Sequence, residues 1–463
     1  MRRIVLIAVV LALAAGAAFW LRAATRRTWT TDSPAALAEY ERGRQAHMRF
    51  YFVDARAAYE RALELDPEFV AAKLALVDSD ADKQVRERLI GELRVADRER
   101  LTERERFLLD ILFARLDDDL IGRTARIEAY LDRHPDDPWA LITAATDAWV
   151  RQDWEVAERR YRRLLEVDPN WVLAHNNLGY IAMAQGRFAE AESRFRTYKF
   201  VAPDQANPHD SLGELLVLVG RYDEARAELE EALAIRPDFC ASYDNLLRLA
   251  VLDRRPGDLD VLAARAQRDC AADHARKLAC MVPVARGFLT GDAEAPWRSA
   301  DPACEEVYRQ PEVLVHRLAL VSGRRELALE IESTLREKAA SVGADFPKAA
   351  EELGTLIAFF EGQRLSIDGD WPAAIERWRA VDAVGQFWQA GGGGVLKLIA
   401  RRELARALAE TGDEAAAAEA IARTRAVNPA FADQPWEGWP LASSPPGDSV
   451  VAAPSARGAS GSI

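Results

Sequence analysis

The sequence has few of the residues and motifs from which catalytic and metal sites are built. Its six histidines are scattered, and no two of them stand four residues apart, which excludes a pair of metal ligands on one helical face. The motifs HExxH, CxxC and GxSxG are absent, and the glycine run at 391–394 completes no phosphate-binding or dinucleotide-binding pattern. We therefore expect a protein that is not an enzyme and has no metal and no cofactor.

The sequence also has fewer basic than acidic residues. Lysine and arginine number 61 against 74 acidic residues, so the net charge is −13. A nucleic-acid binder needs a basic face, which excludes DNA or RNA as the main partner. Only 7 of the basic residues are lysine, which we interpret as the codon bias of a GC-rich bacterial genome. The apolar share of 49% is that of a globular chain, so most of the sequence should fold.

There are only four cysteines, and all of them fall within one window of 65 residues. They are Cys240, Cys270, Cys280 and Cys304. An even number in an exported protein permits two disulfides, with three possible pairings. Buried free thiols are the alternative interpretation. The spacings of 30, 10 and 24 residues match no zinc-binding pattern.

Residues 4–21 form an unbroken apolar run with arginines on both sides. Eighteen helical residues span about 27 Å, close to the ~30 Å hydrocarbon core of a bilayer. A cleaved signal peptide is the alternative, with a weak site at 15–17, but the run continues beyond it to Trp20, which suits a membrane interface. We expect an uncleaved single-pass anchor within residues 1–29, in a bacterial inner membrane, with the bulk of the chain in the periplasm.

A period of 34 residues dominates the middle of the chain. Prolines recur at this spacing at Pro135, Pro169, Pro203 and Pro237. The same frame holds a glycine pair (Gly186, Gly220) and an alanine series (Ala157, Ala191, Ala225). Glycine suits a tight turn, alanine allows two helices to approach, and proline ends a helix. The pattern predicts helical hairpins that must stack on their neighbours, because one hairpin cannot bury both of its faces.

This pattern resembles the tetratricopeptide repeat family, whose best unit here reads WVLAHNNLGYIAMAQGRFAEAESRFRTYKFVAPD. The resemblance implies an all-α solenoid of helical hairpins, here with one N-terminal transmembrane helix. The run from Glu105 to Asp244 is similar to repeat regions of bacterial membrane-associated regulators, where they often follow a winged-helix or kinase domain. The chain before this run has no room for such an effector domain, so the signalling role does not carry over.

The phase of the repeat predicts the organisation of the chain. Three contiguous units occupy 138–239, at 138–171, 172–205 and 206–239. The flanking regions are repeat-like helices at 30–137 with a good repeat at 36–69, degenerate helical repeats at 240–354, and repeat-like helices at 355–436 with a good repeat at 398–431. Residues 437–463 are rich in Ser, Pro, Gly and Ala, which predicts a disordered tail.

The resemblance also implies a working surface, which is the concave groove lined by the first helix of each hairpin. Carried over to this sequence, the lining positions are Asn176, Asn177, Tyr180, Asn207, Asp210, Ser211, Glu214, Asp244 and Asn245. The acidic members would repel a carboxylate-ended peptide, so we expect a protein or peptide partner with a neutral or basic segment. The predicted function is a membrane-anchored, non-catalytic scaffold for protein interaction or complex assembly. The alternative is a sensor or enzyme with a small-molecule site in the degenerate region 240–354, indicated by the cysteine cluster and Trp297.

Overall fold

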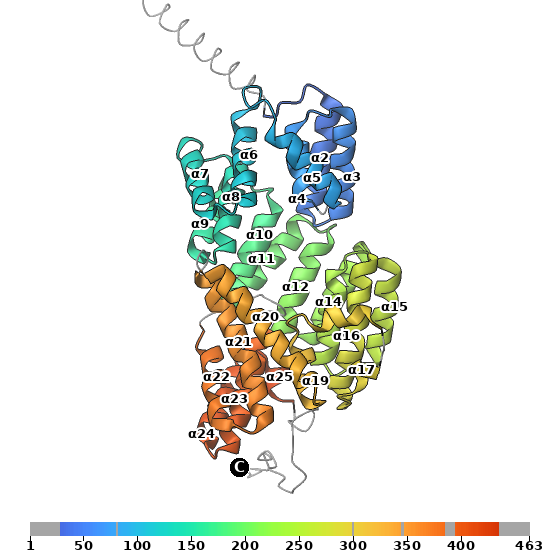
Figure 1. Ribbon diagram of the computed structural model, residues 1–463, viewed down its shortest axis with the longest axis vertical. Helices are drawn as coiled ribbons and strands as arrows, with labels where there is room; N and C mark the ends of the chain where they lie inside the picture. The colour runs from blue at the N-terminus through green and yellow to red at the C-terminus, as the bar shows by residue number, and fades with distance from the viewer. Residues whose placement is uncertain (1–27, 80–81, 299–300, 344–346, 385–393, 435–463) are drawn as a thin grey trace, which may run out of the picture. The chain divides into compact units, whose positions relative to one another are not determined.

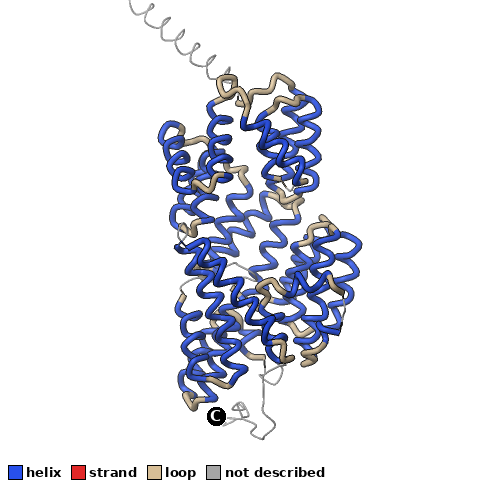
Figure 2. Tube along the Cα trace, viewed as in Figure 1, coloured by secondary structure: helices blue, strands red, loops and turns tan. Residues whose placement is uncertain are grey.

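The computed structural model describes residues 28–79, 82–298, 301–343, 347–384 and 394–434. Within these ranges the regular structure is helical, and the described residues contain no β-strand (Figures 1 and 2). The predicted anchor at 4–21 and the predicted tail at 437–463 lie outside the described residues. No helix in the described ranges combines the length and the apolar character needed to cross a membrane.

The chain divides into two compact units, which are described separately. The first unit is 1–246 with 339–352 and 385–389, and the second is 247–338, 353–384 and 390–463. The helices up to α14 are Pro34–Met48 (α2), Phe52–Leu65 (α3), Val70–Asp78 (α4), Lys83–Arg94 (α5), Glu103–Leu116 (α6), Leu120–Arg133 (α7), Pro138–Val150 (α8), Trp154–Val167 (α9), Val172–Ala184 (α10), Phe188–Val201 (α11), Ala206–Leu218 (α12), Tyr222–Ile235 (α13) and Ala241–Leu252 (α14).

The remaining helices continue the alternation of helix and turn. They are Pro256–Asp258 (η1), Leu259–Asp269 (α15), Ala272–Thr290 (α16), Ala295–Arg298 (α17), Ala303–Tyr308 (α18), Val313–Val321 (α19), Arg325–Gly343 (α20), Pro347–Asp368 (α21), Trp371–Ala383 (α22), Val395–Glu410 (α23), Glu414–Arg425 (α24) and Pro429–Ala432 (α25). The boundary between the units cuts through α14, α20 and α21.

The turns of the hairpins repeat in phase along the chain. Gly186 and Gly220 adopt a left-handed backbone with φ of 71° and 80°. The non-glycine residues with positive φ in the described chain lie a whole number of 34-residue steps from these glycines, and they are Phe50 (62°), Asp118 (54°), Gln152 (57°) and Arg254 (58°). The same backbone turn therefore occurs at six in-phase positions between residues 50 and 254, although position 84, which is also in phase, lies inside α5.

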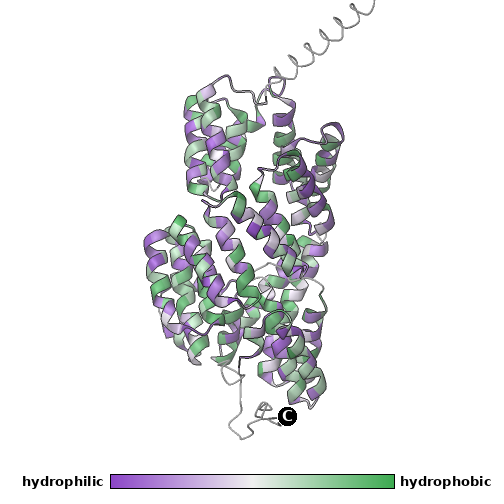
Figure 3. Cartoon of the chain, turned by 180° about the vertical axis from the view of Figure 1, so that it is seen from behind, coloured by the Kyte–Doolittle hydropathy of each residue, from purple (hydrophilic) through white to green (hydrophobic). Residues whose placement is uncertain are grey.

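Close approach of the two helices in a hairpin holds each repeat together. A Cβ atom added at Gly179 would lie 2.5 Å from the ring of Phe195, and one added at Gly213 would lie 2.7 Å from Leu229. Ala191 on α11 is fully buried. The helices present polar and apolar faces in alternation (Figure 3). The prediction of an all-α tetratricopeptide-type solenoid is confirmed.

The second unit has an aromatic core and a disulfide. Trp378 packs edge-on against Phe359, with 5.1 Å between ring centroids, and its Nε1 donates to Ser366 Oγ at 3.0 Å. A disulfide joins Cys280 on α16 to Cys304 on α18. Cys270 in this unit is disulfide-bonded as well, as is Cys240 in the first unit, and the described residues contain no free cysteine.

A buried ionic cluster also lies in the second unit. Glu332 on α20 is fully buried and pairs with Arg364 Nε at 2.9 Å and Arg336 Nη2 at 2.8 Å. The ring of His316, also fully buried, lies with Nε2 3.4 Å from the Glu332 carboxylate and Nδ1 3.0 Å from the Gln363 amide oxygen. Burial alone would raise the pKa of Glu332, but these hydrogen bonds outweigh it and lower the pKa to about 2.

Candidate partner-binding groove

Polar residues on the first helices of successive hairpins form hydrogen bonds with one another. The Ser211 hydroxyl on α12 donates to the Asn176 side-chain oxygen on α10 at 2.8 Å. The Asn245 amide on α14 donates to Asp210 on α12 at 3.1 Å. Both bonds join a residue to the one 35 positions later, so the same link is made at two successive interfaces. We refer to this row on α10, α12 and α14 as the polar ladder.

Two further contacts extend the polar ladder. The Tyr180 hydroxyl on α10 donates to Glu214 on α12 at 2.9 Å and lies 3.3 Å from the Ser211 hydroxyl. The Ser242 hydroxyl donates to Asp210 at 2.7 Å. Burial raises the pKa of Tyr180 well above its usual value, and the charges of Glu214 and Asp210 act in the same direction. Tyr180 therefore remains a proton donor to Glu214 throughout the physiological range.

Two predicted groove residues outside the polar ladder bond to the preceding hairpin. Asn177 donates from its side-chain amide to the Tyr161 hydroxyl on α9 at 2.8 Å. Asn207 donates in the same way to the Tyr198 hydroxyl on α11 at 3.2 Å. In both cases the acceptor lies on the second helix of the preceding hairpin, so these amides hold successive repeats together.

The predicted groove residues also differ in exposure. Asn176, Asp210, Ser211 and Asn245 are buried, and Asp210 is only 4% exposed. Asn177, Tyr180, Glu214 and Asp244 are half-buried. A partner in the groove would therefore meet these four side chains, while the buried members set the distance between neighbouring helices.

Sequence reasoning missed three partners of these residues. Ser242 stands where the two preceding repeats have Ala174 and Pro208, so the repeat pattern gives no sign of a hydroxyl contact there. Tyr161 and Tyr198 do carry a signal, because a buried phenol needs a hydrogen-bond partner. That need could have directed attention to asparagines on the next helix.

The second helices are linked by ion pairs with a period of their own. Arg187 pairs with Glu158 at 3.1 Å, and Arg221 pairs with Glu192 at 2.8 Å. In each pair the arginine follows the glutamate by 29 residues. Such partly exposed pairs each contribute at most about 1 kcal/mol, so they support the register of the stack more than its stability.

Two family models match the centre of the chain. Residues 142–210 match one tetratricopeptide repeat model, and residues 209–239 match a second. With the in-phase hairpins described above, these matches identify residues 142–239 as tetratricopeptide repeats. Repeats of this kind generally form non-catalytic scaffolds for protein interaction.

Several solved structures are similar to the chain. PilW, described as a widely conserved type IV pilus biogenesis factor, is 20% identical, with a TM-score of 0.35, and the match covers 42% of this chain and 94% of PilW. For Pseudomonas aeruginosa pilF these values are 17%, 0.29, 50% and 91%. For the Cut9–Hcn1 hetero-tetramer of APC/C they are 13%, 0.47, 88% and 75%. None of the curated proteins matches the chain by sequence.

Proposed function

We propose that this protein is a membrane-anchored scaffold that binds a neutral or basic segment of a protein partner in its repeat groove and catalyses no reaction. The observation that carries this proposal is the polar ladder. Its buried members satisfy one another across α10, α12 and α14, and this arrangement keeps the helices at a fixed spacing. A groove whose walls are already positioned loses less entropy when a partner binds.

The charge of the groove defines the class of partner. Glu214 and Asp244 are half-buried and acidic, and Asp210 adds a third carboxylate behind them. Two unit charges 4 Å apart interact by about 4 kcal/mol in the partly screened setting of a protein surface. The groove therefore favours lysine, arginine or neutral polar side chains and disfavours a peptide that ends in a carboxylate.

Two observations support the anchor and the export of the repeats. The apolar run 4–21 is long enough to cross a bilayer, although it lies outside the described residues. The disulfide between Cys280 and Cys304 is typical of an oxidising compartment. We therefore place the repeats in the periplasm of a bacterial cell, with a single span in the inner membrane.

Partner capture with groove variants tests the binding proposal. The full-length protein is cross-linked in membranes, solubilised and purified as wild type, as Glu214→Gln with Asp244→Asn, and as Asp223→Asn. Asp223 is an exposed acid on the second helix α13, so its variant is the matched control. We expect wild type and control to retain the same partner and the groove variant to lose it, with equal melting temperatures.

Equal recovery by all three proteins would contradict a groove site. Recovery of no partner, with and without cross-linking, would contradict the scaffold itself. The anchor is tested separately by extracting membranes at alkaline pH and measuring the mass of the mature chain. We expect the protein to stay in the membrane with its N-terminal segment intact, and release of a shortened chain would show cleavage instead.

A further inference from the structure

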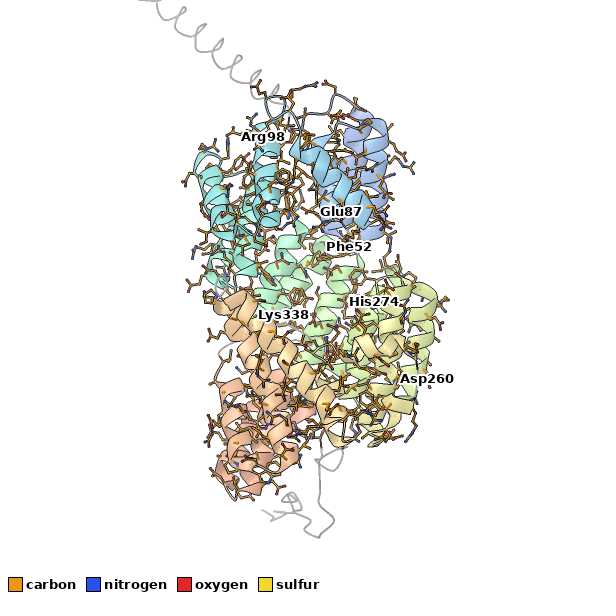
Figure 4. All side chains as sticks on the ribbon, in the orientation of Figure 1. Phe52, Glu87, Arg98, Asp260, His274 and Lys338 are labelled. Carbon is orange, nitrogen blue, oxygen red and sulfur yellow. A yellow bond between two sulfur atoms is a disulfide. The ribbon has the colours of Figure 1, made fainter. Side chains whose placement is uncertain are left out.

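The hairpin of α2 and α3 makes a contact that a simple solenoid lacks. In a stacked repeat protein each unit is expected to touch only its neighbours. Here the Tyr51 hydroxyl, in the turn of the first hairpin, accepts a hydrogen bond from the Ala206 amide at the start of α12, 155 residues later, at 3.2 Å. Arg236, which directly follows α13, pairs with Asp54 at 2.8 Å and lies over the Tyr51 ring at 4.3 Å. Phe52, labelled in Figure 4, marks the tip of this hairpin.

Apolar packing accompanies these polar contacts. Phe50 and Tyr51 pack against a buried cluster of Ala206, Ala232 and Phe239. Phe50 has a φ of 62°, at the turn position that Gly186 and Gly220 occupy in later hairpins. A left-handed conformation costs a residue with a Cβ about 1–2 kcal/mol. Phe50 therefore adopts an unfavourable backbone conformation at the point where its ring packs against the cluster.

The Tyr51 contact also satisfies a backbone amide at the start of α12. The first amides of a helix have no acceptor within the helix. The residue before α12, Gln205, makes no capping hydrogen bond with its side chain. The Tyr51 hydroxyl accepts from the Ala206 amide instead, so a residue of the first hairpin caps a helix of the third contiguous repeat unit.

The same hairpin and the segment before it reach two other first helices. The Arg44 guanidinium on α2 lies 5.8 Å from the ring centroid of Trp139 and 5.7 Å from that of Trp171. Trp29 meets Trp139 edge-on at 5.3 Å. Trp139 is the second residue of α8, and Trp171 directly precedes α10. The N-terminal hairpin therefore contacts the starts of α8, α10 and α12, which all belong to the first unit.

We propose that the α2–α3 hairpin is a strap that fixes the spacing of α8, α10 and α12 and thereby controls the width of the repeat groove. The polar ladder residues Asn176, Asp210 and Glu214 lie on two of these helices. With the strap closed, the helix starts are held together by contacts that bridge three repeats. When the strap opens, the starts of these helices lose the contacts that bridge three repeats, and the polar ladder alone sets the width of the groove. The proposal concerns the first unit itself and holds whether or not the groove binds a partner.

Hydrogen exchange of the full-length protein in detergent, read by mass spectrometry, tests the strap. The test variants are Tyr51→Phe, which removes the cap, and Tyr51→Phe with Asp54→Asn, which also removes the ion pair. Glu60→Gln removes an exposed carboxylate from the same helix α3, away from the tip, and is the matched control. Loss of a hydrogen bond of about 1 kcal/mol corresponds to about fivefold faster exchange where the strap gives protection.

For both test variants we expect faster exchange in residues 204–210 and in the first turn of α10. For the control we expect the exchange rates of wild type. The hydrogen bond of Tyr51 and the ion pair of Asp54 are made with Ala206 and Arg236, which lie outside α10, so a response of α10 reports on the spacing of the helices. A change confined to residues 47–54 would overturn the proposal, since the hairpin tip would then stabilise only itself. An equal response to Glu60→Gln would overturn it as well.

Discussion

The close contact of α10 with α11 predicts that one substitution, made at two glycines, has opposite effects on stability. Replacement of glycine by alanine inside a helix gains about 1 kcal/mol, because alanine loses less backbone entropy on folding. Gly91 on α5 has no atom within 4 Å of an added Cβ. We therefore expect Gly91→Ala to raise the free energy of unfolding by up to about 1 kcal/mol.

At Gly179 the same methyl group meets the ring of Phe195. The added Cβ would lie 2.5 Å from Cε1 and 2.7 Å from Cδ1 of this fully buried ring. Ordinary carbon contacts need about 3.5–4.0 Å, so the ring or the helix must move by roughly 1 Å. Such overpacking costs about 1–3 kcal/mol. After the helical gain, we expect Gly179→Ala to lose about 1 kcal/mol, roughly 2 kcal/mol below Gly91→Ala.

Urea unfolding of the full-length variants, followed by far-ultraviolet circular dichroism, gives the comparison. Since the chain has two compact units, midpoints are compared instead of a single extrapolated free energy. We expect the Gly179→Ala midpoint to fall below wild type and the Gly91→Ala midpoint to rise above it. If both variants are stabilised equally, the close packing of α10 on Phe195 is refuted.

Three further predictions concern the disulfide, the buried carboxylate and the strained turn. Replacing Cys280 and Cys304 by serine should destabilise the second unit by about 3 kcal/mol, measured by urea unfolding, and reductant should then have less effect on the variant than on wild type. The lowered pKa of Glu332, about 2, gives stability that is present above about pH 4.5 and lost as pH falls toward 2. Glu332→Gln should therefore flatten the acid side of the stability profile, and an unchanged profile would contradict the buried cluster. Asp118→Gly should raise the melting temperature, because glycine adopts the left-handed backbone without strain. Phe50→Gly should not raise it, because this substitution also removes apolar packing. An equal rise in melting temperature for both variants would contradict the packing of Phe50 in the strap.

The hairpins of the centre could be predicted from sequence because the repeat carries its own markers. Proline, alanine and glycine recur at fixed positions, and each has a local physical reason to be there. The turns at Asp118, Gln152 and Arg254 could not be found in this way, because a left-handed backbone does not require glycine when the neighbouring helices fix the turn. The left-handed turn therefore recurs at in-phase positions where the sequence has no glycine to mark it.

The helices that carry the predicted groove residues could be named from the sequence, but the contacts of these residues could not. The family resemblance places Asn176 and Asp210 on first helices, and the structure brings both into the polar ladder. Whether two such side chains reach each other depends on the distance between adjacent helices, which a sequence does not state. For the same reason Asn177, equal in type to Asn176, belongs to a different contact, with Tyr161.

The contacts of the α2–α3 hairpin with later repeats could not be predicted from the sequence. Tyr51 and Ala206 are 155 residues apart, and neither belongs to a recurring motif. Contacts of this kind arise from the curvature of the whole stack, which is the sum of small rotations between repeats. The sequence alone therefore does not show that Tyr51 reaches Ala206.

The contact between Asp54 and Arg236 also has a consequence for the order of events during synthesis. These residues are 182 positions apart, so the first hairpin to leave the ribosome must wait for a helix that is made much later. At about 5–20 residues per second this interval is roughly 10–40 s. A repeat protein with only neighbour contacts can fold progressively as it emerges. In this chain the aromatic tip around Phe50 can complete its packing against Ala206, Ala232 and Phe239 only after these later residues have been made.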